Sequence, residues 1–128
     1  MKKQFSSRYP ALVSVGAEER PVNYCGIRCT LEVLGGKWKL LVMLSLLKGP
    51  QRYAELREST PEISDKMLVS TLRDLEYQTL IQRRTLGAGA RQVEYSLTAY
   101  GHSVQPLLLV LYDWGERHIA EHADLLFH

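Results

Sequence analysis

Residues 64–97 read SDKMLVSTLRDLEYQTLIQRRTLGAGARQVEYSL, and the clearest structural signals of the chain lie in this stretch. Leu68, Leu72 and Leu75 follow one another at intervals of four and three residues. That spacing places three apolar side chains along one face of an α-helix. The first half of the stretch therefore predicts an amphipathic helix over residues 64–78.

The second half of the stretch changes its period to two. Val93, Tyr95 and Leu97 alternate with polar residues, as in a β-strand with one buried face. A small, glycine-rich segment at 87–91 separates this run from the apolar pair at 80–81. We therefore predict a β-hairpin with a basic tip.

The outer face of the predicted helix is polar. Lys66, Ser70 and Arg73 lie opposite the leucines, and Ser64 stands where an N-cap hydroxyl belongs. Such a helix, followed by a basic-tipped hairpin, suits a DNA duplex, because a helix fits the major groove and the tip can reach the backbone or the minor groove. The alternative is a solvated helix face beside an ordinary hairpin, and these residues alone leave it open.

Three shorter helices are predicted upstream. The first, over residues 24–34, ends at Gly35-Gly36, where the first glycine can take the left-handed cap. The second, over 38–47, is strongly apolar and is expected to be the central core helix. A short connection at 51–53 leads to the third, over 54–58. These elements describe a winged helix-turn-helix that is mostly α with a small β-hairpin wing.

Beyond the hairpin, Thr98 is expected to cap a last long helix. The run LLLVL at 107–111 is apolar all round the helix, so covering one face with the parent domain would leave the other exposed. Because most soluble oligomers are two-fold symmetric, we expect a homodimer through the N- and C-terminal helices, and a contribution from the N-terminal arm is open. The alternative is a helix buried in its own monomer.

Length and composition are those of one globular domain, which we place at residues 24–128, after an arm at 1–23 that is either disordered or ordered by a partner. The 128 residues carry a net charge of +2. Residues 1–97 contain 15 Lys and Arg against 10 Asp and Glu, whereas residues 98–128 contain 1 against 4. The positive part includes the helix and hairpin, which favours nucleic acid over a membrane as partner.

The sequence favours the cytoplasm. Cys25 and Cys29 cannot form a disulfide framework, which points to a reducing compartment. The apolar stretch at 11–17 is too short and interrupted for a signal peptide. The apolar run at 106–112 is far shorter than the roughly 20 residues that a membrane span needs.

Taken together, these features resemble the HxlR-type family of bacterial winged-helix transcriptional regulators, relatives of the MarR group. The resemblance implies a homodimer on a pseudo-palindromic operator, with the 64–78 helix in the major groove and the wing alongside. It rests on the order and spacing of motifs between Cys25 and Gly115, namely Cys25 followed by Thr30-Leu31, Gly35-Gly36-Lys37-Trp38-Lys39, Arg52-Tyr53-Ala54-Glu55-Leu56, Ile63-Ser64-x-Lys66-Met67-Leu68, Leu72-Arg73-x-Leu75-Glu76, Val93-Glu94-Tyr95-x-Leu97-Thr98, Gly101 and Trp114-Gly115.

The resemblance also implies the residues that contact DNA. Arg73 and Ser70 are expected near base edges or phosphate, and Lys66 and Arg91 mainly on phosphate or in the narrower groove. The full predicted set from the helix and the wing tip is Ser64, Lys66, Ser70, Thr71, Arg73 and Arg91. Further candidates for backbone contact, which simple solvation also explains, are Lys37, Lys39 and Arg52.

Two departures from the family pattern bear on the structure. Thr79 stands where the family usually has glycine after the recognition helix. A β-branched residue tolerates a left-handed cap badly, which leaves open a different joint between helix and wing. Cys25-Gly26 replaces the common Cys-Pro pair, which loosens the backbone beside the cysteine.

Cys25 is a candidate sensor of oxidants or electrophiles, because some members of the family use a cysteine near this position, in some cases through a bridge between subunits. The N-terminus of the following helix and nearby Arg28 would stabilise its thiolate. The alternative is a cysteine packed as a small hydrophobe, which is also what we expect of Cys29. The function expected is a repressor that responds to a redox signal or a small-molecule effector.

No motif predicts a metal, a cofactor or an enzyme. The cysteine pair and the pair His118 and His122 each offer too few ligands for zinc. The chain has no glycine-rich phosphate loop, nucleophile elbow or cofactor signature. The alternative function is a winged-helix module that binds protein through the same face without sequence-specific DNA binding, although a basic outer face favours DNA.

Overall fold

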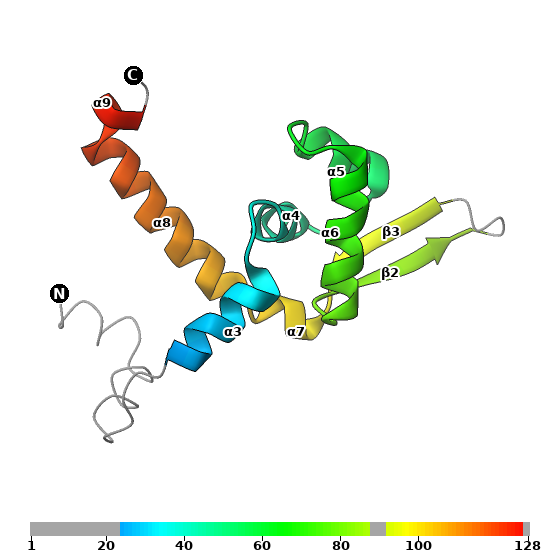
Figure 1. Cartoon of the computed structure of the whole chain (residues 1–128). Coiled ribbons are helices and arrows are strands. Elements are labelled where there is room, and N and C mark those ends of the chain that lie inside the picture. The colour runs from blue at the N-terminus through cyan, green and yellow to red at the C-terminus, as the bar shows by residue number, and fades with distance from the viewer. Residues whose placement is uncertain (1–23, 88–91, 127–128) are drawn as a thin grey trace. The chain divides into compact units, whose positions relative to one another are not determined.

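The computed structural model describes residues 24–87 and 92–126 (Figure 1). The predicted arm at 1–23 and most of the predicted wing tip, including Arg91, lie outside these residues. A boundary after Gly35 divides the chain into two units. Helix α3 (Tyr24–Leu34) belongs to the first, and all later elements belong to the second.

Helix α3 forms where the sequence predicted it, and Ile27 and Leu31 are exposed on it. The Gly35 amide donates to the Leu31 carbonyl at 2.7 Å, which continues the helical pattern by one residue. The left-handed residue is Gly36, with a φ of 97°. The prediction that the first glycine takes this role was therefore wrong, because Gly35 still completes a helical hydrogen bond.

Helix α4 (Lys39–Leu46) is the core helix, as predicted. Val42 and Met43 are fully buried on it. Helices α5 (Tyr53–Ser59) and α6 (Asp65–Tyr77) form the helix-turn-helix around it. The other buried apolar residues of this core include Leu46, Leu56, Ile63, Leu68, Leu72, Leu75, Leu80, Ile81 and Leu97.

The predicted hairpin belongs to a three-stranded antiparallel sheet with the order β1-β3-β2. Strands β2 (Ile81–Leu86) and β3 (Gln92–Leu97) pair in register along their whole length. Strand β1 (Gln51–Arg52) pairs with β3 opposite Tyr95 and Glu94. The sequence predicted only a connection there, and that was wrong; two residues are too few to show the alternation of a strand.

The joint between α6 and the wing keeps the left-handed cap despite its threonine. Thr79 has a φ of 61°. The Leu80 amide donates to the Leu75 carbonyl at 3.0 Å, and the Thr79 amide donates to the Glu76 carbonyl at 3.0 Å. These are the two hydrogen bonds of a Schellman motif. The different joint that the sequence left open is therefore not formed.

The C-terminal region consists of α7 (Ala99–His102), α8 (Gln105–Glu121) and α9 (Ala123–Leu126). Thr98 caps α7, as predicted, by accepting a hydrogen bond from the Gly101 amide at 2.9 Å. The single long helix predicted here was wrong, because Pro106 has no amide hydrogen and its ring would clash with the carbonyl one turn earlier. Within the described residues, none of the helices has the length and hydropathy to cross a bilayer.

Helix α8 exposes apolar side chains over much of its surface, as its sequence predicted. Trp114 is 63% exposed, whereas Leu108 is buried. The other large hydrophobic residues exposed on α8 are Leu109, Leu111, Tyr112 and Ile119.

Candidate nucleic-acid interface

The outer face of α6 carries a row of polar side chains. Lys66, Ser70 and Arg73 are exposed, and Leu68 and Leu72 are buried on the opposite face. The intervals of four and three residues keep the three polar side chains on one line along the helix. The sequence prediction of an amphipathic helix is therefore confirmed.

Ser64 and Thr71, two other predicted contacts, differ in position. Ser64 caps α6 by accepting a hydrogen bond from the Met67 amide at 3.1 Å, and it remains exposed. Thr71 is only 4% exposed. It follows Leu68 by three residues and precedes Leu75 by four, so it shares their buried face. The prediction of Thr71 as a DNA contact is therefore corrected.

Each acidic residue of α6 is paired with a cation from a different element. Asp65 Oδ1 lies 2.7 Å from Arg57 Nε of α5. Asp74 Oδ2 lies 4.0 Å from Lys39 Nζ of α4, and Glu76 Oε1 lies 3.8 Å from Arg83 Nε of β2. These pairs offset the negative charge of the helix, so the positive charges of its outer row are not cancelled.

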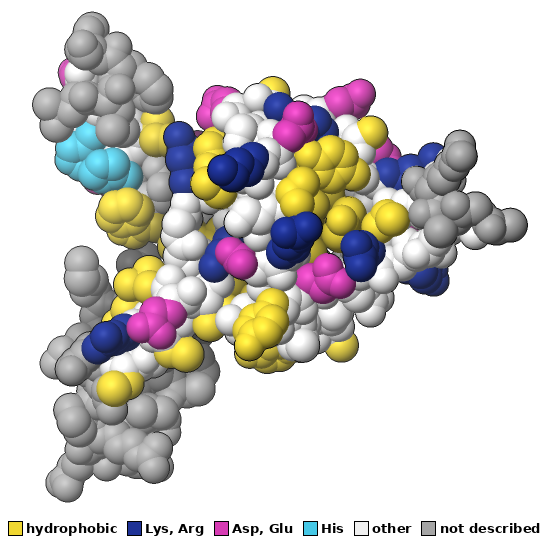
Figure 2. Space-filling model, turned by 45° about the vertical axis from the view of Figure 1, so that its right-hand side comes forward, with side chains coloured by type: hydrophobic (Ala, Val, Ile, Leu, Met, Phe, Trp, Pro, Cys, Tyr) yellow, Lys and Arg dark blue, Asp and Glu magenta, His cyan; other side chains and the backbone are white. Residues whose placement is uncertain are grey.

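Lys66 and Arg73 are not within ion-pair distance of any carboxylate in the described part of the chain. Two cations are thus available on the outer row for an external anion. Figure 2 shows a face on which Lys and Arg side chains alternate with acidic and hydrophobic ones.

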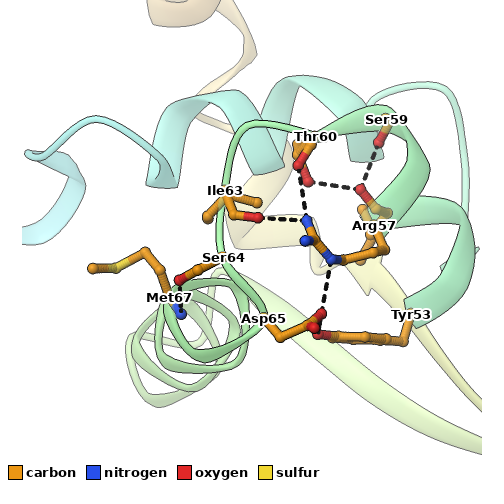
Figure 3. Close-up of polar contacts among 9 residues, drawn as sticks. Tyr53, Arg57, Ser59, Thr60, Ile63, Ser64, Asp65 and Met67 are labelled. Carbon is orange, nitrogen blue, oxygen red and sulfur yellow. Dashed lines mark hydrogen bonds and ion pairs between the residues drawn. The ribbon is translucent and has the colours of Figure 1, made fainter.

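Arg57 holds the turn that leads into α6 (Figure 3). Its Nη1 donates to the Thr60 carbonyl at 3.3 Å and also to the Ile63 carbonyl, while its Nε pairs with Asp65. Tyr53 Oη donates to Asp65 Oδ1 at 2.9 Å. One guanidinium therefore ties α5, the turn and the first residue of α6 together, which fixes the direction in which the outer row points.

Partial burial, followed by the hydrogen bond and the charge of Asp65, raises the pKa of Tyr53 above its ordinary value. The phenol therefore stays protonated at neutral pH. It can act as the donor that this contact with the carboxylate requires.

The three candidates for backbone contact have different surroundings. Lys37 is exposed, and its Nζ lies 4.8 Å from the centre of the Trp38 ring. The side chain of Lys39 is only 20% exposed and pairs with Asp74. Arg52 is exposed directly before α5, and its backbone amide donates to Glu55 Oε1 at 3.0 Å.

Sequence reasoning missed three exposed residues on α6 and β2. Tyr77 is 85% exposed and follows Arg73 by four residues, so it extends the row toward the end of α6. The helical spacing could have identified it. Arg83 and Arg84 are exposed on β2, next to the predicted start of the strand. Their partners come from other elements, which local sequence patterns do not show.

Both cysteines are exposed on α3, and neither is in a disulfide. Cys25 is therefore accessible, as a sensor thiol has to be, whereas the prediction that Cys29 is packed was wrong. Arg28 Nε lies 3.5 Å from Glu32 Oε1, so its positive charge is partly offset by this carboxylate.

Two residues of α8, Trp114 and His118, form an aromatic stack with His122, the residue that follows the helix. The ring centres of Trp114 and His118 are 5.1 Å apart, and those of His118 and His122 are 4.3 Å apart. Across the described ranges, the structure contains no cluster of three or more potential metal ligands from His, Cys, Asp or Glu.

An open pocket of about 260 Å³ lies beside α4 and the turn after α5. It is smaller than the roughly 300 to 1,000 Å³ typical of sites for small organic ligands. The residues that line it are Trp38, Leu41, Leu44, Ser45, Lys48, Ser59, Thr60, Pro61 and Glu62.

Known proteins share this architecture. Residues 33–123 match the family model described as HxlR-like helix-turn-helix. YkvN of Bacillus subtilis (strain 168), an uncharacterized HTH-type transcriptional regulator, is 46% identical over 91 residues, which cover 71% of this chain and 77% of that protein.

Two solved structures are also similar. The redox regulator HypR in its oxidized form is 36% identical, with a TM-score of 0.69, over 73% of this chain and 96% of that one. The reduced form of the transcriptional regulator YodB from B. subtilis is 30% identical, with a TM-score of 0.64, over 72% of this chain and 90% of that one. The chain therefore belongs to the HxlR-like helix-turn-helix family.

Proposed function

We propose that this chain is a DNA-binding transcriptional regulator, acting as a repressor, that binds a pseudo-palindromic operator as a homodimer. The observation that carries the proposal is the outer row of α6. Lys66 and Arg73 are exposed there, on a helix whose own acidic residues are already paired with other cations. A helix of this kind presents positive charge and hydrogen-bond donors to the edges of base pairs and to phosphates.

The dimensions of α6 fit this role. Its 13 residues span about 20 Å, and a helix fits into the major groove. Ser64, the N-cap, and Lys66 lie at the N-terminal end of this helix, where Lys66 would mainly contact phosphate. Ser70 and Arg73 continue the contact along the row, and Arg91 at the wing tip remains a proposed contact with phosphate or the minor groove.

The homodimer is supported by α8. Its exposed apolar residues include Leu111, Tyr112 and Trp114, and an apolar surface of this kind is costly to leave in water. A second copy of the chain would cover it through a two-fold interface. Two α6 helices would then reach half-sites about one helical turn apart, or a multiple of that distance.

We propose that Cys25 makes the regulator responsive to oxidants. Its thiol is exposed in the first turn of α3, and the similar protein HypR is a redox regulator. Two Cys25 thiols from two copies would lose two electrons and two protons to a peroxide or a quinone and form one disulfide.

Non-reducing electrophoresis after mild peroxide or quinone treatment tests this step. A band at twice the 14.6 kDa of the chain is expected for the wild type and for Cys29→Ser, but not for Cys25→Ser. An unchanged Cys25 after treatment, or a crosslink that depends on Cys29 alone, would contradict the proposal.

The DNA-binding proposal is tested on the DNA beside the gene. An inverted repeat there, prepared as a labelled duplex, should bind the purified chain with two copies per duplex and more tightly than a scrambled duplex of equal length. Equal affinity for both duplexes would contradict the proposal of sequence-specific DNA binding.

The alternative function is a winged-helix module that binds another protein through α6. The exposed Met67 and Tyr77 favour it, because aromatic residues and methionine are enriched in protein interfaces. Under this alternative, neither duplex would bind with a strong dependence on salt.

A further inference from the structure

An ion pair joins the end of the recognition helix to the wing. Glu76 lies in the last turn of α6, and its Oε1 is 3.8 Å from Arg83 Nε on β2. Both side chains are accessible, with Glu76 39% exposed and Arg83 55% exposed. The highly exposed Tyr77 is the next residue of α6. This junction therefore places a cation and an anion close to the proposed DNA-binding row.

The register of the hairpin determines which side Arg83 faces. Arg83 lies opposite Tyr95, and the neighbouring pair on the same face, Ile81 and Leu97, is buried. Side chains alternate along a strand, so Arg83 is on the face of the hairpin that meets α6. Arg84 is on the other face, where it pairs with Glu94 at 3.4 Å.

Arg83 can readily exchange Glu76 for another anionic partner. Exposed ion pairs between side chains contribute little to folding and weaken further with salt. A phosphodiester of DNA offers an arginine a charge-assisted hydrogen bond, and each phosphate neutralised releases counterions. A cation beside the recognition helix can therefore change partner from carboxylate to phosphate when a duplex arrives.

We propose that Arg83 is a phosphate contact in the DNA-bound protein and that Glu76 competes with the phosphodiester for it. The pair then sets the strength of DNA binding independently of base sequence. This inference rests on the proposed function, because it adds a residue and a tuning device to the same interface.

The test compares wild type with Arg83→Gln, Glu76→Gln and the double variant. Dissociation constants are measured by fluorescence anisotropy on the inverted-repeat duplex and on a scrambled duplex, over a series of NaCl concentrations. Arg83→Gln should weaken binding to both duplexes by a similar factor, on the order of tenfold, and should reduce the slope of log K against log salt by about one. Glu76→Gln should strengthen binding to both duplexes, and the double variant should bind like Arg83→Gln.

Arg84→Gln is the matched control, since it removes the same kind of side chain from the neighbouring residue on the opposite face. It should leave the salt slope closer to that of the wild type. Thermal melting establishes whether each variant is folded. If Arg83→Gln does not fold, the affinity of Glu76→Gln for the two duplexes tests the proposal.

Two results would overturn the inference: an unchanged salt slope in Arg83→Gln, or unchanged or weaker binding by Glu76→Gln. Both presuppose that the wild type binds DNA with a measurable salt slope. If the wild type does not bind DNA, the proposed function itself is contradicted. Failure of the inference about Arg83 can therefore be distinguished from failure of the proposed function.

Discussion

Helices α6 and α8 both leave a face uncovered, but the chemistry of the two faces differs. The uncovered face of α6 carries Lys66, Ser70 and Arg73. The uncovered surface of α8 carries residues such as Leu111 and Trp114. Water solvates the first readily, whereas it solvates the second at a cost in free energy. The two helices are therefore suited to different partners, a polyanion for α6 and an apolar protein surface for α8.

Charge is also distributed differently between α6 and the C-terminal region. The acids of α6 are each matched by a cation from another element, so its outer cations remain effective. The segment from residue 98 onward holds a single cation against 4 acidic residues. A polyanion would be repelled there. Under the proposed function, DNA would therefore meet α6 and a second copy of the chain would meet α8.

The largest effect is expected from a charge placed on α8. Leu111→Asp should raise the dissociation constant of the homodimer about 100-fold, equivalent to about 3 kcal/mol, because the carboxylate would be buried without a partner. Analytical ultracentrifugation measures this change. Ala120→Asp, an exposed site on the polar side of the same helix, is the control and should remain dimeric. A monomeric wild type would contradict the role given to α8.

The next largest effect, on folding stability, is expected at Gly101 of α7, which packs against the Leu80 carbonyl between α6 and β2. A Cβ at Gly101 would lie 1.9 Å from the Leu80 carbonyl oxygen. Gly101→Ala should therefore lower the free energy of unfolding by about 2 to 3 kcal/mol, as expected for overpacking against backbone.

Urea denaturation followed by circular dichroism measures the change at Gly101. Gly26→Ala is the matched control, since a Cβ at that helical position meets nothing within 4 Å. It should leave stability unchanged or raise it by about 0.5 kcal/mol. Equal effects of the two substitutions would show that the contact with Leu80 is not restrictive.

A smaller effect, of opposite sign, is expected at Thr79. Its φ of 61° is unfavourable for a β-branched residue. Thr79→Gly should raise the free energy of unfolding by about 0.5 to 1 kcal/mol, because glycine takes this conformation without steric cost. The change is read from the urea midpoint, and a lower midpoint would mean that the hydrogen bond from Thr79 Oγ1 to the Gln78 carbonyl, at 2.6 Å, outweighs the backbone strain.

Local patterns in the sequence predicted much of the fold. Leucine spacing identified α6, alternation identified the hairpin, and the hydroxyls of Ser64 and Thr98 marked two helix starts. The break between α7 and α8 could have been read from Pro106, and the burial of Thr71 from its spacing to the leucines.

Other features depend on contacts between elements that are distant in the sequence. Strand β1 exists only because β3 lies beside it. The pairs of Arg57 with Asp65 and of Arg83 with Glu76 join different elements, and no single helix or strand predicts them. The direction of the recognition helix is thus a tertiary property, which composition and periodicity do not encode.

The role of α6 in DNA binding is tested with a chain that lacks the two outer cations of this helix. Lys66→Ala combined with Arg73→Ala is compared by fluorescence anisotropy with the wild type and with Lys48→Ala combined with Arg117→Ala, which removes equal charge from exposed sites outside α6. Loss of the α6 pair should reduce the salt slope by about two and weaken operator binding at least tenfold more than loss of the control pair. Equal affinities and slopes for the two double variants would contradict the assignment of α6 as the DNA-binding helix.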